Sequence, residues 1–298
     1  MLQTKTALNG ERCLYLYGVV ASHSIEPNRL RTVEDASGVF LVHASNLACV
    51  ASSVRVADYR DQSQDIPPNQ PKNQLGNCLE WLAPRVMRHH EMIRNLHEIT
   101  TVVPFKFGTL CASASQAQEI LQQLRQPLTR LLGHFDGREE WGVRVVVDQA
   151  ATMRSIEEMA PELIALRKSA AEQSPGEVYF LQKRRQKLAA ALVQELVFSL
   201  SDNIEQRLEK CAVQIVRNAS VAGERDKSKL AVLSAAILIN RNRLESLEAI
   251  LEQVESECSR YGLATELSGP WPPYSFSTDL HSFQNSASGE VAQASGAS

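Results

Sequence analysis

The sequence predicts an α+β protein of two domains: a small N-terminal α+β domain and a C-terminal, modified ferredoxin-like (βαββαβ) domain with long helices. Three observations indicate this fold class. The chain has 298 residues, about the size of two average domains. Short, β-prone apolar segments alternate with longer amphipathic segments, so strands and helices are mixed along the chain. From Trp141 onward, one extra helix aside, the order is β-α-β-β-α-β, an arrangement in which two helices cover one face of an antiparallel sheet.

The N-terminal domain, residues 1–138, contains four apolar segments of strand character. The predicted strands are residues 13–20, 39–44, 47–54 and 101–110. Ser45-Asn46 is a turn-forming pair, so the second and third strands are expected to form a hairpin. Pro104 removes one backbone donor from the fourth strand and favours an edge position. Residues 57–77 are polar and rich in proline, which indicates an exposed loop.

Two helices complete the predicted N-terminal domain. Apolar residues recur at spacings of four and three from Leu75 to Leu96, one face of an amphipathic helix. Pro84 either occupies the first turn of that helix or kinks a longer one. The second helix is expected to begin at a capping box formed by Ser115 and Gln118 and to end at Gly133.

The C-terminal domain, residues 139–276, carries the second set of strands and the longest helix. The predicted strands are residues 141–148, 213–216, 230–239 and 264–267. A helix over residues 156–171 is interrupted at Pro161, and a long helix begins near Pro175, because proline is favoured in a first helical turn.

The last part of the chain contains a helix, an aromatic segment and a polar tail. Asn240 can cap the helix, and Gly262 can end it. Prolines then separate three aromatic residues, Trp271, Tyr274 and Phe276. Such a stiff segment loses little entropy on docking, either against its own domain or against a partner. Residues 277–298 are small and polar, which predicts a disordered tail.

Composition excludes several classes of protein. Apolar residues make up 44% and charged residues 22%, as in ordinary soluble proteins. The net charge is −3, so the chain lacks the basic excess typical of nucleic-acid binding. No apolar run approaches the ~20 residues that span a bilayer, and the first dozen residues lack the apolar core of a secretory signal. We therefore expect a cytoplasmic protein that binds neither nucleic acid nor membrane.

Cysteine and histidine spacing argues against a metal site. The six cysteines are far apart and form no C-x-x-C pair, the usual source of structural zinc ligands. His89, His90 and Glu91 resemble the start of a metalloprotease motif, but Arg94 stands where H-E-x-x-H needs its second histidine. His97 is too far along the helix to replace it. We therefore predict no metal, no cofactor and no catalytic residue, with His89 hydrogen-bonded on the buried helix face.

Four segments, in order along the chain, carry a resemblance to a known family. They are His90-Glu91 with Val103-Pro104-Phe105-Lys106-Phe107-Gly108-Thr109, Glu140-Trp141-Gly142-Val143, Pro175-Gly176-Glu177-x-Tyr179 with Arg184-Arg185, and Leu267-Ser268-Gly269-Pro270-Trp271-Pro272-Pro273-Tyr274-Ser275-Phe276. Through these segments the sequence resembles the gas vesicle protein GvpL/GvpF family. The resemblance covers residues 14–276 and implies two α+β domains, the second ferredoxin-like.

The resemblance also implies a function. It implies a non-enzymatic gas vesicle accessory or minor structural protein that binds the apolar shell protein GvpA, prevents its aggregation and supports vesicle assembly. Other gas vesicle accessory proteins are further expected partners, and the gas vesicle is the expected location. We expect partner binding through an apolar surface that includes Phe105, Phe107, Trp271, Tyr274 and Phe276.

Two alternatives from other functional classes remain at this point. One is a ferredoxin-like regulatory protein that binds a small molecule, which would need a polar-lined cleft between the two domains and would show a ligand-induced thermal shift. The other is a metal-dependent hydrolase centred on His89, His90 and Glu91.

Overall fold

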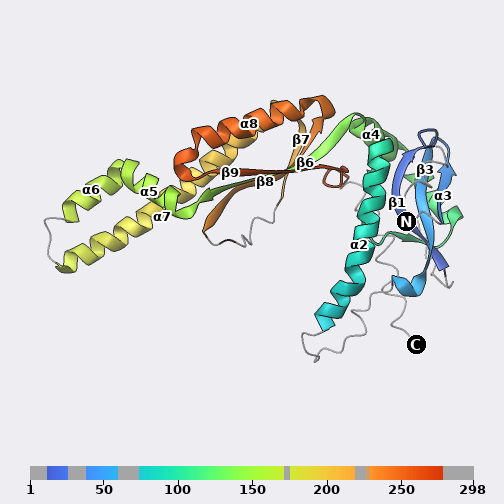
Figure 1. Ribbon diagram of the computed structural model, residues 1–298, viewed down its shortest axis with the longest axis horizontal. Helices are drawn as coiled ribbons and strands as arrows, with labels where there is room; N and C mark the ends of the chain where they lie inside the picture. Colours follow the sequence, from blue (N-terminus) through green and yellow to red (C-terminus); the bar gives the residue numbers. More distant parts are fainter. Residues whose placement is uncertain are drawn as a thin grey trace. The chain divides into compact units, whose positions relative to one another are not determined.

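The chain divides into two units (Figure 1). The computed structural model describes residues 12–25, 38–59, 74–170, 175–218, 226 and 228–277, without the side chains of residues 74–81, 170, 175 and 176. Unit 1 comprises Met1–Arg138 together with Trp271–Ser298, and unit 2 comprises Glu139–Pro270. The segment that begins at Trp271 therefore belongs to unit 1, whereas the sequence pattern placed it in the C-terminal domain. Of the predicted tail, all but Ser277 lies outside the described residues.

Unit 1 is built on an antiparallel five-stranded sheet with the order β2-β3-β1-β4, in which β5 also pairs with β1. The strands are β1 (Arg12–Ala21), β2 (Val39–Ala44), β3 (Leu47–Arg55), β4 (Val103–Pro104) and β5 (Leu110–Cys111). Ser45 turns the chain between β2 and β3 with a φ of 55°. The predicted hairpin is thus present.

Helices pack on unit 1's sheet. They are α2 (Gln74–Ile99), α3 (Ala114–Gln123) and α4 (Arg125–Phe135), with a short 3-10 turn, η1 (Val56–Asp58). Met92, Ile93 and Leu96 of α2 pack against Tyr15 and Tyr17 of β1 in one apolar cluster. Successive side chains of a strand point to opposite faces. Buried residues such as Leu16 and Val19 of β1 are not members of this cluster. Helix α3 contacts β2 and β3, and α4 contacts β1 and β4.

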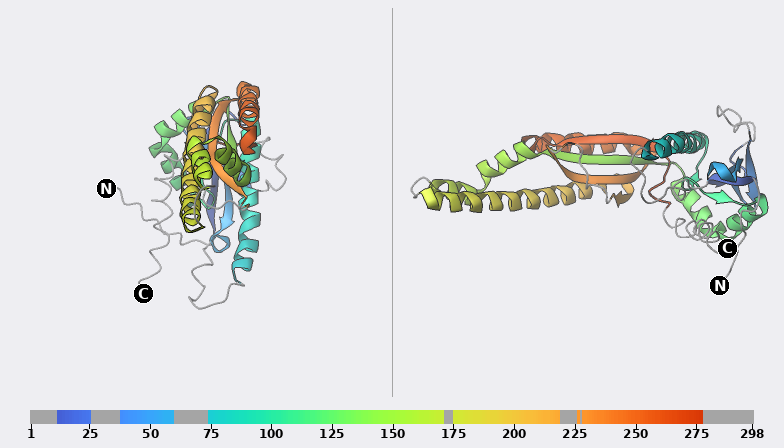
Figure 2. Two further views of the ribbon diagram at one scale, coloured as in Figure 1. Left: turned by 90° about the vertical axis from the view of Figure 1, so that its left-hand side faces the viewer. Right: turned by 90° about the horizontal axis from the view of Figure 1, so that it is seen from below.

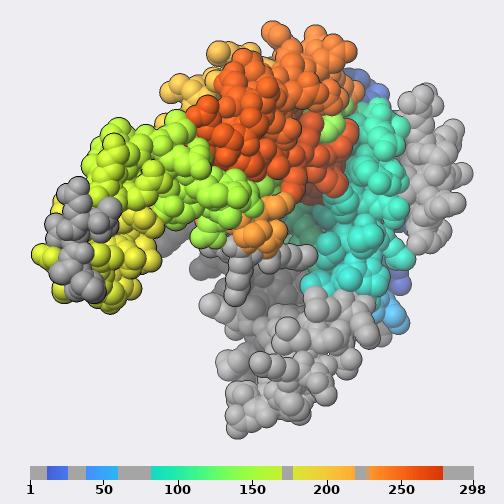
Figure 3. All heavy atoms as spheres, turned by 60° about the vertical axis from the view of Figure 1, so that its left-hand side comes forward, coloured from blue at the N-terminus to red at the C-terminus, as the bar shows by residue number. Residues whose placement is uncertain are grey.

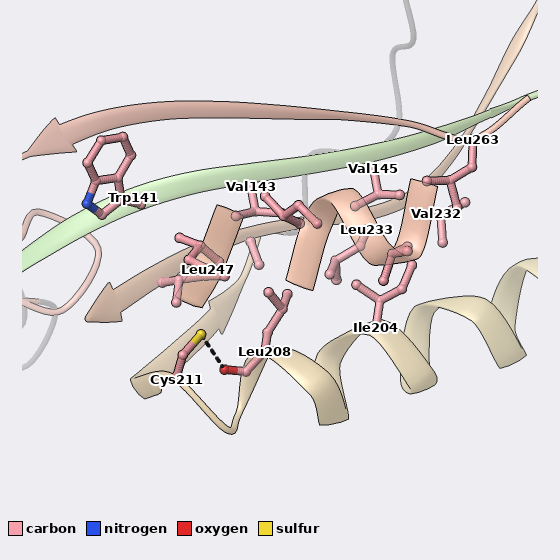
Figure 4. Packing of buried hydrophobic residues seen from close by; sticks show 14 of the residues in the cluster. Trp141, Val143, Val145, Ile204, Leu208, Cys211, Val232, Leu233, Leu247 and Leu263 are labelled. Carbon is pink, nitrogen blue, oxygen red and sulfur yellow. Dashed lines mark hydrogen bonds between the residues drawn. The ribbon is translucent and has the colours of Figure 1, made fainter. Parts of the chain in front are cut away.

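Unit 2 contains a four-stranded sheet with the order β7-β8-β6-β9. The strands are β6 (Arg138–Asp148), β7 (Ala212–Arg217), β8 (Lys229–Asn240) and β9 (Ala264–Trp271). The helices are α5 (Gln149–Met159), α6 (Pro161–Ala170), α7 (Pro175–Leu208) and α8 (Leu244–Glu257), with short turns η3 (Arg241–Arg243) and η4 (Ser259–Tyr261). Figure 4 shows the core, in which α7 and α8 place Ile204, Leu208 and Leu247 against Val143 and Val145 of β6.

The long helix α7 has two different environments. Its C-terminal part packs on the sheet through Leu200, Ile204 and Leu208. Its N-terminal part runs beyond the sheet and contacts α5 and α6, which together form a helical hairpin (Figure 2, right). This hairpin is defined as α5, α6 and the part of α7 before Leu200, and its helices pack on one another.

The structure corrects several element boundaries. The predicted strand over residues 101–110 is two short strands, because Gly108, with a φ of 82°, turns the chain between them. Pro84 lies inside α2, and Asn240 makes no side-chain cap hydrogen bond.

The predicted helix that ends at Gly133 is two helices. The first of these helices, α3, begins directly after Ser113. The Ser113 Oγ accepts a hydrogen bond from the Gln116 N–H at 3.2 Å. Ser113-x-x-Gln116 has the same spacing as Ser115-x-x-Gln118, so the local pattern offers two equivalent starts. Gly133 lies within α4, and the chain turns at Gly137.

None of the helices in the described part of the chain combines the length and apolar composition that crossing a bilayer requires.

Candidate functional site

His89 lies in the core of unit 1, with an exposed fraction of 4%. Its Nε2 is 3.2 Å from the Phe105 carbonyl oxygen, and its Nδ1 is 2.8 Å from the Tyr15 hydroxyl. Because a carbonyl only accepts, Nε2–H donates to Phe105 and Nδ1 accepts from the Tyr15 O–H. The Tyr15 oxygen in turn accepts from the Gly108 N–H at 3.1 Å.

Burial lowers the pKa of His89 to about 4, although its hydrogen bond to the Phe105 carbonyl acts in the opposite direction. The imidazole is therefore neutral at pH 7. Both ring nitrogens already have partners within the protein. His89 is thus a structural residue that joins α2 to β1 and to the loop after β4.

The remaining members of the histidine cluster point elsewhere. The His90 ring stacks on Tyr274, with centroids 6.0 Å apart, and lies 5.4 Å from Trp271. Glu91 is exposed and sits 3.9 Å from Arg94. Within the described ranges, no three histidine, cysteine or acidic side chains are placed to hold a metal ion together.

The five aromatic residues proposed for partner binding all lie in unit 1, around α2. Phe105 and Phe276 are buried, with exposed fractions of 2% and 6%. Phe107 and Tyr274 are half-buried and pack against the same apolar cluster. Trp271 has the largest exposed fraction of the five, 36%. The segment after Trp271 therefore packs on its own chain, and only part of this set offers contact area.

Among the described residues, the two large apolar side chains with the highest exposed fractions belong to the hairpin of unit 2, and Met87 of α2 follows at 69%. Phe180 and Phe198 have exposed fractions of 73% and 71%, and Tyr179 and Met159 also lie on the surface. An apolar groove of about 390 Å³ runs between α5 and α7 and is lined by Ile156, Met159, Leu192, Leu196 and Tyr261, among others. Figure 3 shows the hairpin, in yellow and green, projecting beyond α8 and β9.

This surface was not among the predicted partner-binding residues. The apolar residues that recur along α7 and include Leu192, Leu196 and Leu200 indicate only the face that packs within the protein. Tyr179, Phe180 and Phe198 lie off that face, and large aromatic side chains off the stripe of an amphipathic helix are the signal that was available. Basic residues follow Phe180 along α7, and among them Arg185 lies 3.7 Å from Glu157 of α5. Lys183 lies 5.9 Å from the Tyr179 ring.

Comparison with known proteins gives a consistent result. The family model of the gas vesicle synthesis protein GvpL/GvpF matches residues 13–278. The chain belongs to the GvpL/GvpF family. It is 27% identical to gas vesicle protein L of a Streptomyces strain over 214 residues, which covers 69% of this chain and 75% of the relative. It is 20% identical to gas vesicle protein F1 of Halobacterium salinarum over 268 residues, covering 90% and 93%.

Solved GvpF structures share the fold. The crystal structure of GvpF from Anabaena sp. PCC7120 matches with a TM-score of 0.61 at 14% identity, covering 89% of this chain and 96% of that one. GvpF from Microcystis aeruginosa matches with a TM-score of 0.57 at 15% identity, covering 89% and 98%. This GvpL/GvpF protein therefore has the mixed helix and sheet fold of GvpF and belongs to a family that takes part in gas vesicle formation.

Proposed function

We propose that this GvpL/GvpF protein is a non-enzymatic accessory protein, or minor structural component, of gas vesicles. In this proposal it binds the shell protein GvpA, prevents its aggregation and so supports vesicle assembly at the vesicle in the cytoplasm. Other gas vesicle accessory proteins are further partners. Family membership along nearly the whole chain supports the proposal.

The physical reason for such a protein lies in the vesicle wall. A gas-filled interior stays dry only if its wall is too apolar for water to condense there. Before assembly, the same apolar face exposes free shell subunits to aggregation. A partner with an apolar surface can cover that face, and this burial contributes a favourable free energy of about 25 cal/mol per Å² of apolar surface.

The exposed apolar surface of the hairpin is the observation that carries this proposal. Phe180 and Phe198 expose most of their side chains, and the groove between α5 and α7 of the same hairpin is lined mainly by apolar residues. We propose that GvpA docks there. The second candidate surface consists of Trp271 and Tyr274 in unit 1, whose side chains are partly exposed.

Co-purification of GvpA with tagged variants tests the proposal. Replacing a central aromatic contact costs ~2 kcal/mol or more, a loss of affinity of about thirtyfold or greater. We expect Phe180→Ser/Phe198→Ser to lose capture of GvpA and the matched variant Trp271→Ala/Tyr274→Ala to retain it, with both folded by circular dichroism. The reverse result would move the interface to unit 1. Failure of the wild-type protein to capture GvpA would contradict the proposed function.

We also interpret unit 2 as a modified ferredoxin-like domain. The sheet order β7-β8-β6-β9 supports this interpretation, because it places the first and third strands of the unit in the centre. The helices α5 and α6 are then additions that extend the first crossover and create the hairpin.

A further inference from the structure

One side of α7 is exposed along the hairpin, and its residues recur at a regular spacing. The exposed residues that follow one another at intervals of four and three are Phe180, Arg184, Lys187, Ala191, Gln194 and Phe198. A helix places residues at this spacing on one side, and the same spacing forms the contact line between two paired helices. We call these six residues the outer face of α7. The buried residues Ala189 and Val193 lie on the opposite side of the helix.

The outer face is symmetric about Ala189. Phe180 and Phe198 are equally far from Ala189 along the chain, and so are Lys187 and Ala191. At a rise of 1.5 Å per residue, the two phenylalanines are about 27 Å apart. Two copies of α7 that lie antiparallel and cross at Ala189 therefore place Phe180 of each copy against Phe198 of the other. Each pair joins two side chains that are more than 70% exposed in the single chain, at 73% and 71%.

Charges beside the outer face favour this antiparallel arrangement. Arg184 and Glu195 are both exposed, and they are about three helical turns apart, so they lie on the same side of α7. They are almost equally far from Ala189 in opposite directions, so the antiparallel pairing places Arg184 of each copy beside Glu195 of the other. A two-fold axis makes this ion pair occur twice. A parallel pairing would instead place Arg184 beside Arg184 and Lys187 beside Lys187, and like charges across an interface oppose association.

The centre of the antiparallel pairing is compatible with close approach of the helices. Lys187 lies opposite Ala191, whose small side chain leaves room for the aliphatic part of the lysine. The lysine ammonium group can then remain in water at the edge of the contact. In Figure 2 (right), α5 and α6 lie along one side of α7.

We propose that α7 pairs antiparallel with α7 of a second copy of this chain, through Phe180, Phe198 and the ion pair between Arg184 and Glu195. Large exposed apolar residues on one surface are typical of a protein interface. GvpA is proposed to use the same two phenylalanines, so the second copy covers them in the free protein and GvpA replaces it. Pairing of two copies needs no GvpA, and the two proposals can therefore fail separately.

Sedimentation velocity of the purified full chain, without GvpA and over a series of concentrations, tests the proposal. We expect the wild-type protein to show a monomer–dimer equilibrium. Phe180→Ser/Phe198→Ser should weaken dimerisation at least about thirtyfold, because both aromatic contacts are lost in each copy. A wild-type protein that sediments as a monomer at every concentration overturns the proposal and leaves the outer face to GvpA. Unchanged dimerisation of the double variant also overturns it.

Charge reversal tests the antiparallel arrangement. Arg184→Glu and Glu195→Arg each place like charges at both ion-pair positions of their own dimer, and we expect each to weaken dimerisation about tenfold. An equal mixture of the two single variants should recover the wild-type affinity, because both positions then join opposite charges. No contact within one chain can produce this recovery, since every chain in the mixture carries only one substitution.

Arg130→Glu is the matched control for charge reversal. Arg130 is an exposed residue of α4 in unit 1, so its reversal should leave dimerisation unchanged. The proposal is overturned if the mixture of Arg184→Glu and Glu195→Arg dimerises as weakly as each variant alone, or if Arg130→Glu weakens dimerisation equally.

Discussion

Tyr15, His89 and Phe105 show how a residue can resemble a metal ligand in sequence and serve packing in the structure. His89 donates to the Phe105 carbonyl and accepts from Tyr15, so its two nitrogens are satisfied without a ligand. The sequence predicts that His89 is buried, because its position follows the apolar stripe of α2. Its partners could not be predicted, since Tyr15 is 74 positions away along the chain.

The neutral state of His89 predicts a pH dependence of stability. Its pKa falls to about 4 in the folded state, while the unfolded value is ~6.5. The unfolded state therefore binds more protons between these values, and stability is lost as the pH falls through them. Urea unfolding should show up to about 2 kcal/mol less stability from this residue at pH 5 than at pH 7.

The variant His89→Gln should flatten this dependence more than His90→Gln does. His90 is only half-buried, and burial lowers its pKa as well, so it serves as a matched variant with a smaller expected effect. An identical pH profile for the wild-type protein and His89→Gln would contradict the assignment of a neutral, buried imidazole.

Gly18 gives a second prediction at the residue scale. A Cβ at this position would lie 2.8 Å from Val102 Cγ2 and 2.9 Å from the Val103 carbonyl oxygen, where β1 meets the chain leading into β4. We expect Gly18→Ala to lower the free energy of unfolding by ~1–3 kcal/mol, measured in urea. In Gly133→Ala the new Cβ meets nothing within 4 Å inside α4, so it should raise stability by ~0.5–1 kcal/mol. Equal effects would show that the close approach at Gly18 is absent.

At the scale of the element, α7 combines a structural part and an exposed part. Ile204 is 1% exposed and packs on the sheet, so Ile204→Ala should cost ~2–5 kcal/mol in urea unfolding. Phe180→Ser removes a side chain that is already 73% exposed and should change stability by ~0.5 kcal/mol or less. A large loss for Phe180→Ser would mean that this ring is covered within the protein rather than available to a partner.

Sequence periodicity predicted most elements of both sheets, because an apolar pattern of period two or 3.6 is a local property of the chain. It failed where two local signals were equivalent or conflicting. The two serine caps before α3 have the same spacing, and Gly133 suits a helix end as well as an exposed helical position. Only packing against the sheet decides between such alternatives.

At the scale of the whole molecule, the chain leaves unit 1 at Arg138 and rejoins it at Trp271. The returning segment buries Phe276 in unit 1 and stacks Tyr274 on His90. We expect Phe276→Ala to raise amide hydrogen exchange in β1 and α2 while leaving β8 and α8 unchanged. Increased exchange in unit 2 alone would contradict the assignment of this segment to unit 1.

The sequence by itself determined the mixture of helices and strands, the long helix from Pro175 and the family, because each depends on residues that are close together along the chain. Tertiary structure alone decided which of the aromatic residues are covered and that the segment after Trp271 returns to unit 1. These features are contacts between distant segments. Their energies depend on which surfaces meet after folding, and no local pattern records that pairing.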